Sequence, residues 1–336
     1  MNLIPHSNGI KRLRIRKKIP ISAIMKFLIY SLITILLMGL VFQFAVTKVY
    51  NEKYKPRTKY TRINDNRVYY NSIGSGDMTV IFDGDLGVDS NEWNTITREV
   101  ADSLGVRVFT YNRMGYGFSD GGEGLDPQRQ AEDLRLLLNK AGISGPYVLV
   151  GAGYGSLIMT NFANTYGDLV NSMVLIDPIV ESKLDNEEYI SNYIKIKKNS
   201  KLETTQSYFG LTYIKYRLGM LEIPENLFSE GQTELKNEFI SNRIRSKYPS
   251  AMNNEASNIL EKKSNSQKEG LIENSPLAII SRNKNVELDK SLLTLSTSRY
   301  INQLVTESNG QMIPVEDKNK VLEAIKYAVE KGRVKR

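Results

Sequence analysis

The most distinctive pattern in the chain is an uncharged apolar run of twenty residues, from Phe27 to Val46, framed by Lys26 and Lys48. At about 1.5 Å per residue, a helix of this length spans roughly 30 Å, the hydrocarbon thickness of a bilayer. A buried core helix would show a polar stripe, and a signal peptide would end in small residues at a cleavage site. This run shows neither and is interrupted only by Tyr30, Ser31, Thr34 and Gln43. We therefore predict an uncleaved transmembrane anchor over residues 27–47.

Beyond the anchor, short apolar runs alternate with amphipathic runs. The runs typical of strands are VYYNSIG, TVIFDG, RVFTYNR, PYVLVG, NSMVLIDP, PLAIISRN and RYINQLVTE. The runs typical of helices are NEWNTITREVADSLG, DPQRQAEDLRLLLNKAG, Tyr154 to Tyr166, ELDKSLLTLS and PVEDKNKVLEAIKYAVEKG. The second of these has Asp126 as its N-cap and Pro127 at its first position. Because the strand-like runs are apolar along their length, they predict a mostly parallel, doubly wound sheet with helices on both faces.

The alternation stops between about residues 181 and 270, where the chain is charged, Asn-rich and helical in period. We interpret this stretch as a helical cap on the α/β body. Its aromatic residues follow helical spacing, as the pair Tyr189 and Tyr193 and the set Phe209, Tyr213 and Tyr216. Such residues either line a pocket beneath the cap or bind the cap to the body, and the second role is the more common one.

The chain therefore divides into a basic tail (1–26), the anchor (27–47), a polar tether (48–62) and a globular domain (63–336) that includes the cap. Residues 1–62 hold thirteen of the 45 basic residues and one of the 37 acidic residues. The remainder carries 32 bases and 36 acids, so the body is slightly acidic, which argues against a nucleic-acid partner. The predicted partner is instead the lipid bilayer, through residues 27–47.

The orientation of the anchor follows from the basic residues on its two flanks. The cluster KRLRIRKK precedes the span, and a looser set of basic residues follows it. The denser cluster favours a single-pass protein with a cytoplasmic N-terminus and its globular domain outside.

Two residue types are missing from the body. The chain contains no cysteine, and its single histidine is His6, on the other side of the anchor from the body. Disulfides, thiolate metal sites and cysteine nucleophiles are excluded, and a histidine general base is excluded from the folded domain of a single chain. We expect neither a metal nor a cofactor.

Four short motifs stand in order along the body. YVLVGAGYGSLIM has the strand, tight turn and helix of a G-x-S-x-G nucleophile elbow, with Gly153 in place of the serine. FDGDLGVDSNEW, YNRMGYGFSD and SNGQMIPVEDKNKV resemble three further turns of the α/β-hydrolase fold family: the oxyanion loop, the turn after the fourth strand and the turn that carries the catalytic histidine. The resemblance covers about residues 66–332 and implies an α/β-hydrolase fold with a helical cap, preceded by one transmembrane helix.

The resemblance also shows what the site lacks. Catalysis in this family needs a serine nucleophile, a histidine that takes its proton and an acid that orients the histidine. Gly153 stands at the serine position and Gln311 at the histidine position, and glutamine does not shuttle protons near neutral pH. The orienting acid would follow the seventh strand, where the chain has Asn283, Lys284 and Asn285, or would be Asp177. Ser156 lies a turn into the helix, too far along to replace the nucleophile.

Other groups near the elbow could still act. Asp83, at the position of the family's oxyanion-loop histidine, and Asp85 lie on the loop expected to face the vacant site, so Asp83, Asp85 and Asp177 are candidate acids. Acids on such a loop more often cap a helix or face solvent than catalyse. The backbone of Gly84, Asp85 and Tyr154 could form an oxyanion-type pocket able to receive a carbonyl or carboxylate.

Three functions remain open. The first is a membrane-anchored α/β-hydrolase-fold protein that has lost serine-hydrolase catalysis and binds a small ligand or a protein partner. The second is an active hydrolase that uses unconventional carboxylates. The third is a structural or assembly protein at the membrane, with a collapsed pocket and the cap as its interface.

Overall fold

The computed structural model describes residues 20–54, 56, 58–122, 124–223, 227–228, 232–308 and 312–335. Within them, one eight-stranded sheet has the strand order β1-β2-β4-β3-β5-β6-β7-β8. Strands β1, β2 and β4 pair antiparallel, and the remaining pairs are parallel. The strands are β1 Lys59–Ile63, β2 Asn66–Ile73, β3 Thr79–Asp83, β4 Arg107–Tyr111, β5 Tyr147–Ala152, β6 Val170–Ile176, β7 Leu277–Arg282 and β8 Ile301–Thr306. The predicted mostly parallel sheet is confirmed.

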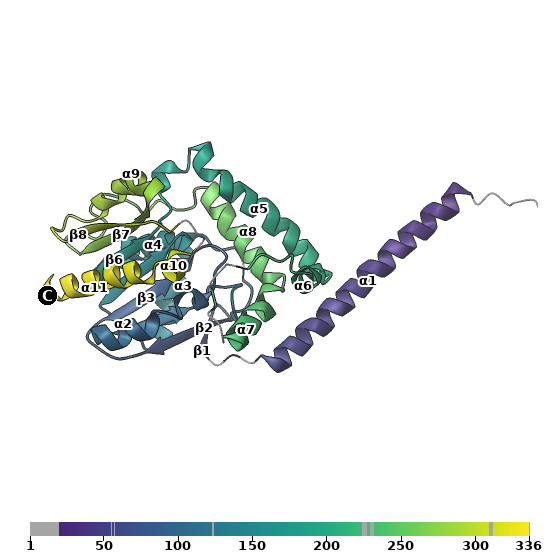
Figure 1. Cartoon of the computed structure of the whole chain (residues 1–336), viewed down its shortest axis with the longest axis horizontal. Coiled ribbons are helices and arrows are strands. Elements are labelled where there is room, and N and C mark those ends of the chain that lie inside the picture. The colour runs from purple at the N-terminus through teal and green to yellow at the C-terminus, as the bar shows by residue number, and fades with distance from the viewer. Residues whose placement is uncertain are drawn as a thin grey trace, which may run out of the picture.

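Helices cover both faces of this sheet (Figure 1). One face packs against α2 and α11, and the other against α3 and α4. These helices are α2 Thr97–Leu104, α3 Pro127–Lys140, α4 Tyr154–Tyr166 and α11 Lys318–Lys335. In α3, the side chain of Asp126 accepts a hydrogen bond from the N–H of Arg129, as its predicted role as N-cap requires.

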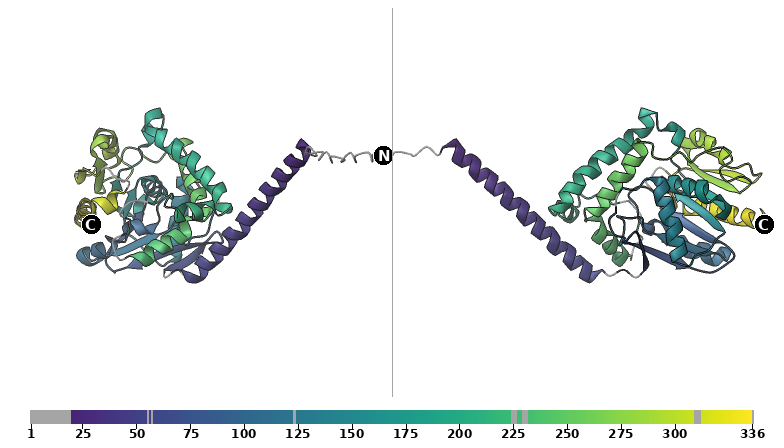
Figure 2. Two further views of the ribbon diagram at one scale, coloured as in Figure 1. Left: turned by 45° about the vertical axis from the view of Figure 1, so that its right-hand side comes forward. Right: turned by 180° about the vertical axis from the view of Figure 1, so that it is seen from behind.

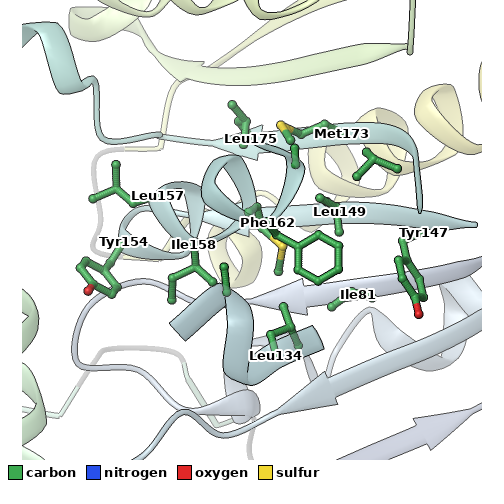
Figure 3. Close-up of a cluster of buried hydrophobic side chains, with 14 of the residues drawn as sticks. Ile81, Leu134, Tyr147, Leu149, Tyr154, Leu157, Ile158, Phe162, Met173 and Leu175 are labelled. Atoms are coloured by element: carbon green, nitrogen blue, oxygen red, sulfur yellow. The ribbon is translucent and has the colours of Figure 1, made fainter. Parts of the chain in front are cut away.

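The two cores follow from the two-residue period of the strands. Ile81 and Leu149 point to one face, where they meet Phe162 of α4 and Leu134 of α3 (Figure 3). Their neighbours Val80, Phe82, Val148 and Val150 point to the opposite face and pack beneath α2 and α11. The central strands β3 and β5 are therefore buried along their whole length.

The cap forms a layer of helices on one side of the body (Figures 1 and 2). It consists of α5 Glu187–Tyr208, α6 Leu211–Arg217, α7 Thr233–Arg243 and α8 Lys247–Leu260. No strand occurs in the described part of residues 181–270, in agreement with the sequence pattern.

Three local predictions need correction. The first helix-like run after β3 divides into a 3₁₀ turn, Ser90–Trp93, and α2, which ends at Leu104 and has Gly105, with φ 59°, as its C-cap. The run after β7 forms only α9 Val286–Asp289 and a 3₁₀ turn. The last helical run contains α10 Ile313–Glu316 before α11. In each case the sequence has helical periodicity, but the folded chain changes direction within the run and forms two shorter elements.

Most described residues of the segment predicted as a tether, 48–62, belong to a helix or a strand. Helix α1, Ile21–Lys53, continues past residue 47, and β1 begins at Lys59 as an edge strand on β2. The sequence of β1 is polar because only one side of this edge strand contacts the body.

Helix α1 extends away from the body at its N-terminal end (Figures 1 and 2). Among the described residues it is the one helix long and apolar enough to cross a membrane, and none of its residues is fully buried. Its half-buried positions near the body recur at helical spacing, at Gly39, Gln43, Val46 and Tyr50.

Candidate functional site

The turn between β5 and α4 has the geometry of a nucleophile elbow. Gly153 adopts φ 46° and ψ −115°, in the left-handed half of backbone space where a side chain is strained. Gly155 lies against the backbone of Asp83, where a Cβ would come within 2.5 Å of the Asp83 carbonyl oxygen. Gly151 in turn lies against Gly155. A Cβ on Gly151 would be 2.8 Å from the carbonyl oxygen of Gly155. Both glycines therefore allow the close approach of helix and sheet.

The carboxylate of Asp85 fills the space in front of this elbow. Its Oδ1 accepts hydrogen bonds from the N–H of Tyr154 at 2.9 Å and from the N–H of Leu86 at 2.6 Å. A Cβ built on Gly153 would overlap the same oxygen. The protein thus places its own carboxylate oxygen where a nucleophile side chain and a substrate oxyanion would meet.

This arrangement differs from the expectation of an open oxyanion-type pocket at Gly84, Asp85 and Tyr154. The N–H of Tyr154 is taken by Asp85, so an incoming carbonyl or carboxylate could reach it only after the Asp85 side chain moves. The sequence placed Asp85 on the correct loop, but the direction of its side chain depends on N–H groups that converge only in the folded protein.

Burial sets the protonation of the acids at the elbow. It raises the pKa of Asp85, against the opposing effect of the two N–H bonds, and the negative charge of Asp177 raises it further. Burial also raises the pKa of Glu92 well above its usual range, and the charge of Asp85 adds to that shift. Glu92 accepts a hydrogen bond from the N–H of Asp85 at 3.3 Å.

Asp83 does not face the elbow. It is buried, and its two oxygens accept bonds from the guanidinium of Arg113 and from the hydroxyl of Tyr111, the latter at 2.6 Å. Arg113 also binds Glu255 of the cap helix α8, with its Nε 2.8 Å from Oε1. Tyr116 donates to the other oxygen of Glu255 at 2.7 Å. Asp83 is therefore one carboxylate of a buried ion network that ties the cap to the body.

Arg113 also fixes the loop that carries Asp85. It donates to the carbonyl oxygens of Gly84 at 2.8 Å and Asp85 at 2.9 Å. Buried charges persist only when they are paired and hydrogen-bonded, and here one guanidinium serves two carboxylates and two carbonyls. This arginine holds the backbone from which the Asp85 side chain projects.

Asp177 lies at the end of β6 with a positive φ of 43°. Its Oδ2 is 2.6 Å from Nε of Arg282, and its Oδ1 accepts a hydrogen bond from Asn285 at 3.0 Å. Arg282 ends β7, and Asn285 stands in the segment where the family's orienting acid was expected. Asp177 is therefore held by an arginine and an amide.

Ser156 has a structural role. It is fully buried, its hydroxyl donates to the carbonyl of Gly153 at 2.6 Å and accepts from the N–H of Ile179 at 3.1 Å. The hydroxyl thereby links the backbone of the elbow to the backbone of Ile179.

The aromatic residues of the cap divide into two groups. Tyr189 and Tyr193 of α5 have ring centroids 6.4 Å apart, and the Tyr189 hydroxyl accepts a hydrogen bond from the N–H of Val180 at 2.9 Å. Burial raises the pKa of Tyr189 to about 12 and that of Tyr193 well above its usual range, with further contributions from the charges of Asp85 and Asp177. This pair therefore packs against the core of the body. The other set contacts α1 instead.

Gln311, at the expected histidine position, lies outside the described residues, as does His6. The buried Met312 marks the point where the described chain resumes before α10. In the described part of the chain, no group of three or more histidine or acidic residues is arranged to hold a metal ion.

A cavity of about 80 Å³ lies beside this site. Val68 and Leu134 supply part of its apolar wall, and Arg113, Lys247 and Glu255 supply polar groups. Its lining includes neither Gly153 nor Asp85, so it is separate from the elbow. Burial lowers the pKa of Lys247 to about 7, and its ammonium donates to the carbonyls of Gly117 and Ser119, both at 2.6 Å.

Sequence reasoning missed Glu92 and Glu255, two buried acids next to the elbow loop. Glu92 lies in a run that reads as an ordinary amphipathic helix, and Glu255 lies in the charged cap. No local pattern distinguishes a buried acid with a distant arginine partner from a solvated one.

The comparisons with known proteins agree with this architecture. A model of the α/β hydrolase fold family matches residues 80–270, more than half of the chain. The chain therefore belongs to the α/β-hydrolase fold family. It is 31% identical over 106 residues to the uncharacterized protein YqjL of Bacillus subtilis (strain 168), a match that covers 31% of this chain and 41% of YqjL.

Solved structures of the same fold include enzymes. The epoxide hydrolase CorEH, without ligand, has a TM-score of 0.61 at 19% identity and covers 79% of this chain and 95% of its own. A thermophilic esterase from Thermogutta terrifontis has a TM-score of 0.59 at 20% identity, covering 83% and 99%. At these identities the similarity shows the fold alone.

Proposed function

We propose that this chain is a membrane-anchored α/β-hydrolase-fold protein that does not perform serine hydrolysis and acts by binding a small ligand or a protein partner. The observation that carries the proposal is the pairing of Gly153 with Asp85. The elbow has no side chain, and the space in front of it holds a carboxylate already bonded to the N–H groups of Leu86 and Tyr154. Both the nucleophile and the free oxyanion donors that acyl transfer needs are absent from this arrangement.

Membrane anchoring is supported by α1, a helix of 33 residues that is long and apolar enough to cross a membrane. Its side chains away from the cap are exposed and apolar, as lipid-facing residues are. The basic cluster before the span supports a cytoplasmic N-terminus, which places the globular domain outside.

The proposal is tested on the full chain purified in detergent micelles. A serine-directed fluorophosphonate and a panel of carboxylic esters and epoxides are applied to the wild type, with a known serine esterase as the positive control. Esters and epoxides are chosen because the similar solved structures include an esterase and an epoxide hydrolase. We expect no labelling and no turnover above that of heat-denatured protein. Reproducible labelling of any serine in the body would contradict the proposal.

The second candidate is an active enzyme that uses Asp85 as its reacting carboxylate. The overlap of Asp85 Oδ1 with the Cβ position of residue 153 favours it, because that oxygen stands at the elbow. The hydrogen bonds of Asp85 oppose it. The N–H groups of Leu86 and Tyr154 stabilise its carboxylate and are then not available to a substrate oxyanion. Turnover of any panel substrate that is lost in Asp85→Asn but kept in Asp83→Asn would establish this second function.

A third candidate, a structural role with the cap as interface, agrees with the filling of the elbow by Asp85. It differs from the first in predicting no small-molecule ligand. Ligand-induced thermal stabilisation by any member of a metabolite library would exclude it.

A further inference from the structure

Helix α1 packs against the cap through specific contacts. The Phe42 ring lies 5.7 Å from the Tyr213 ring of α6, and the Tyr50 ring lies 6.1 Å from the same tyrosine. The Gln43 side chain donates to the carbonyl oxygen of Ile244, at the end of α7, at 3.3 Å. The cap thus holds one side of the apolar helix.

Helix α1 and the cap approach closely because each contributes a glycine to the contact. A Cβ on Gly39 would lie 2.8 Å from the carbonyl oxygen of Phe209. Gly210, with φ 74°, has the ring of Phe42 directly beside its Cβ position. Small residues at such crossings allow helix backbones in membranes to approach closely.

These contacts fix the depth of α6 relative to the apolar run. Phe42 lies four residues, and Gly39 seven residues, before Val46, where the run ends. At 1.5 Å per residue, these positions are about 6 Å and 10 Å inside the end of the run along the helix axis. Cap residues that touch Gly39 and Phe42 share that depth, which lies just inside the boundary between headgroups and acyl chains.

The outer surface of the cap at this level is apolar. We call it the α6 apolar surface; it consists of Tyr208, Leu211, Ile214, Leu218 and Met220, all exposed. Leu218 and Met220 are 67% and 66% exposed, whereas large apolar side chains of soluble proteins are more often buried. Arg217 lies on the same helix, is exposed, and can extend its charge to lipid headgroups.

We infer that the α6 apolar surface inserts into the lipid bilayer beside α1, so that the cap lies on the membrane. This inference rests on the proposed membrane anchoring. Lipid is the occupant because the cap contacts the apolar run of α1 at Gly39 and Phe42, so that its exposed apolar side chains lie beside a helix proposed to face lipid. Interfacial helices of this composition bury their apolar side about 5–10 Å into the boundary region, which agrees with the depth set by Phe42 and Gly39.

The absence of cysteine from the chain allows a direct test. Single-cysteine variants of the full chain, Leu218→Cys and Met220→Cys, are labelled with an environment-sensitive fluorophore. The protein is reconstituted in phosphatidylcholine vesicles with a minority of phosphatidylserine, and nitroxide lipids quench at the headgroup, at shallow acyl depth and at deep acyl depth. Leu36→Cys, inside the apolar run, reports the anchor. Lys326→Cys on α11, with its side chain 63% exposed, reports the aqueous side.

We expect shallow acyl nitroxides to quench the probes at 218 and 220 at least twofold more than the probe at 326. The probe at 36 should be quenched most by the deep nitroxides. Quenching at 36 with water-like behaviour at 218 and 220 would overturn the inference and leave the anchor intact. Probes at 218 and 220 shielded from both lipid and aqueous quenchers would identify a second copy of the chain as the occupant and also overturn it. Absence of quenching at 36 would overturn the anchor and the inference together.

Discussion

Gly153 and Asp85 form a matched pair, because each accommodates the other. A serine at position 153 would need the strained φ of the elbow and would overlap the Asp85 carboxylate. Asp85 would have to leave its two N–H donors, and burial of those donors without partners costs free energy. The lack of a side chain at position 153 and the position of the Asp85 carboxylate are thus linked at the level of single atoms.

The first prediction is a stability coupling between these two positions. Gly153→Ser should lower the free energy of unfolding by about 3 kcal/mol, through backbone strain and displacement of Asp85. In an Asp85→Ala background the same substitution should cost about 1–2 kcal/mol less, because the overlap is gone. Denaturant unfolding of the four proteins in this cycle measures the coupling. Additive costs would mean that the Asp85 side chain does not occupy the elbow.

A second prediction concerns Asp289, a buried acid on α9. Burial raises its pKa to about 7, and the charge of Asp177 adds to the shift. Between pH 4 and 7 the folded state therefore keeps a proton that the unfolded state has lost. Stability falls as pH rises through that window and levels off above it. Asp289→Asn cannot ionise and should escape this loss.

The stability of Asp289→Asn relative to wild type should therefore rise by on the order of 4 kcal/mol between pH 4 and pH 8. Denaturant unfolding at both pH values gives the difference. Asp185→Asn, at a side chain 84% exposed, serves as the control and should show little change. A constant difference between variant and wild type would indicate an ordinary pKa for Asp289 in the folded protein.

At the scale of elements, the cap is held from two sides. On the inner side, Glu255 of α8 joins Arg113 of the body through a buried ion pair. On the outer side, α6 and α7 contact α1 through Tyr213 and Ile244. The cap therefore lies between the sheet and the apolar helix, and changes in α1 should be transmitted to it.

The third prediction tests that coupling. Gly39→Leu should push α1 away from Phe209, because its side chain overlaps backbone that cannot move independently. Overpacking of this kind costs about 1–3 kcal/mol. Hydrogen exchange of the α6 amides should become faster in detergent micelles, while exchange in β5 stays unchanged. Met38→Phe adds volume on a side chain that is 59% exposed and should leave α6 exchange as in wild type. Equal protection of α6 in both variants would contradict the docking of α1.

For the whole molecule, the sequence predicted the sheet well because its central strands are buried on both faces. Strands β3 and β5 are continuous apolar runs, and the glycines around the elbow are required by local backbone geometry. The edge strand β1 was missed because it is polar and gains its structure only by pairing with β2. The 3₁₀ turn at Ser90–Trp93 was missed because helical periodicity does not show where the chain must bend.

The site was predictable in its positions but not in its contacts. The missing side chain at Gly153 is visible in the sequence, whereas the direction of Asp85 depends on N–H groups of Leu86 and Tyr154 that meet only after folding. The aromatic residues of the cap show the same limit. Their spacing suggested a pocket or a contact with the body, and the structure divides them between the body and α1.

The last prediction concerns the independence of the globular domain. The sequence separates the anchor from the body and predicts that removal of residues 1–48 leaves a soluble folded domain. The structure shows that α1 covers part of the cap, so this separation is incomplete. Removal of residues 1–54 exposes the surface around Tyr213 and Phe209 next to the α6 apolar surface. The joined patch should drive self-association, as large exposed apolar patches do.

The truncated chain should keep its circular-dichroism spectrum and cooperative unfolding, because both cores of the sheet lie outside α1. Light scattering after size exclusion should show oligomers in buffer that dissociate in mild detergent. Adding Leu211→Lys and Leu218→Lys to the truncated chain should restore a monomer, because both side chains are exposed and no core contact is lost. A truncated chain that is monomeric without these substitutions would show that α1 covers little apolar surface of the cap. A chain that unfolds on truncation would show that α1 is part of the folding unit.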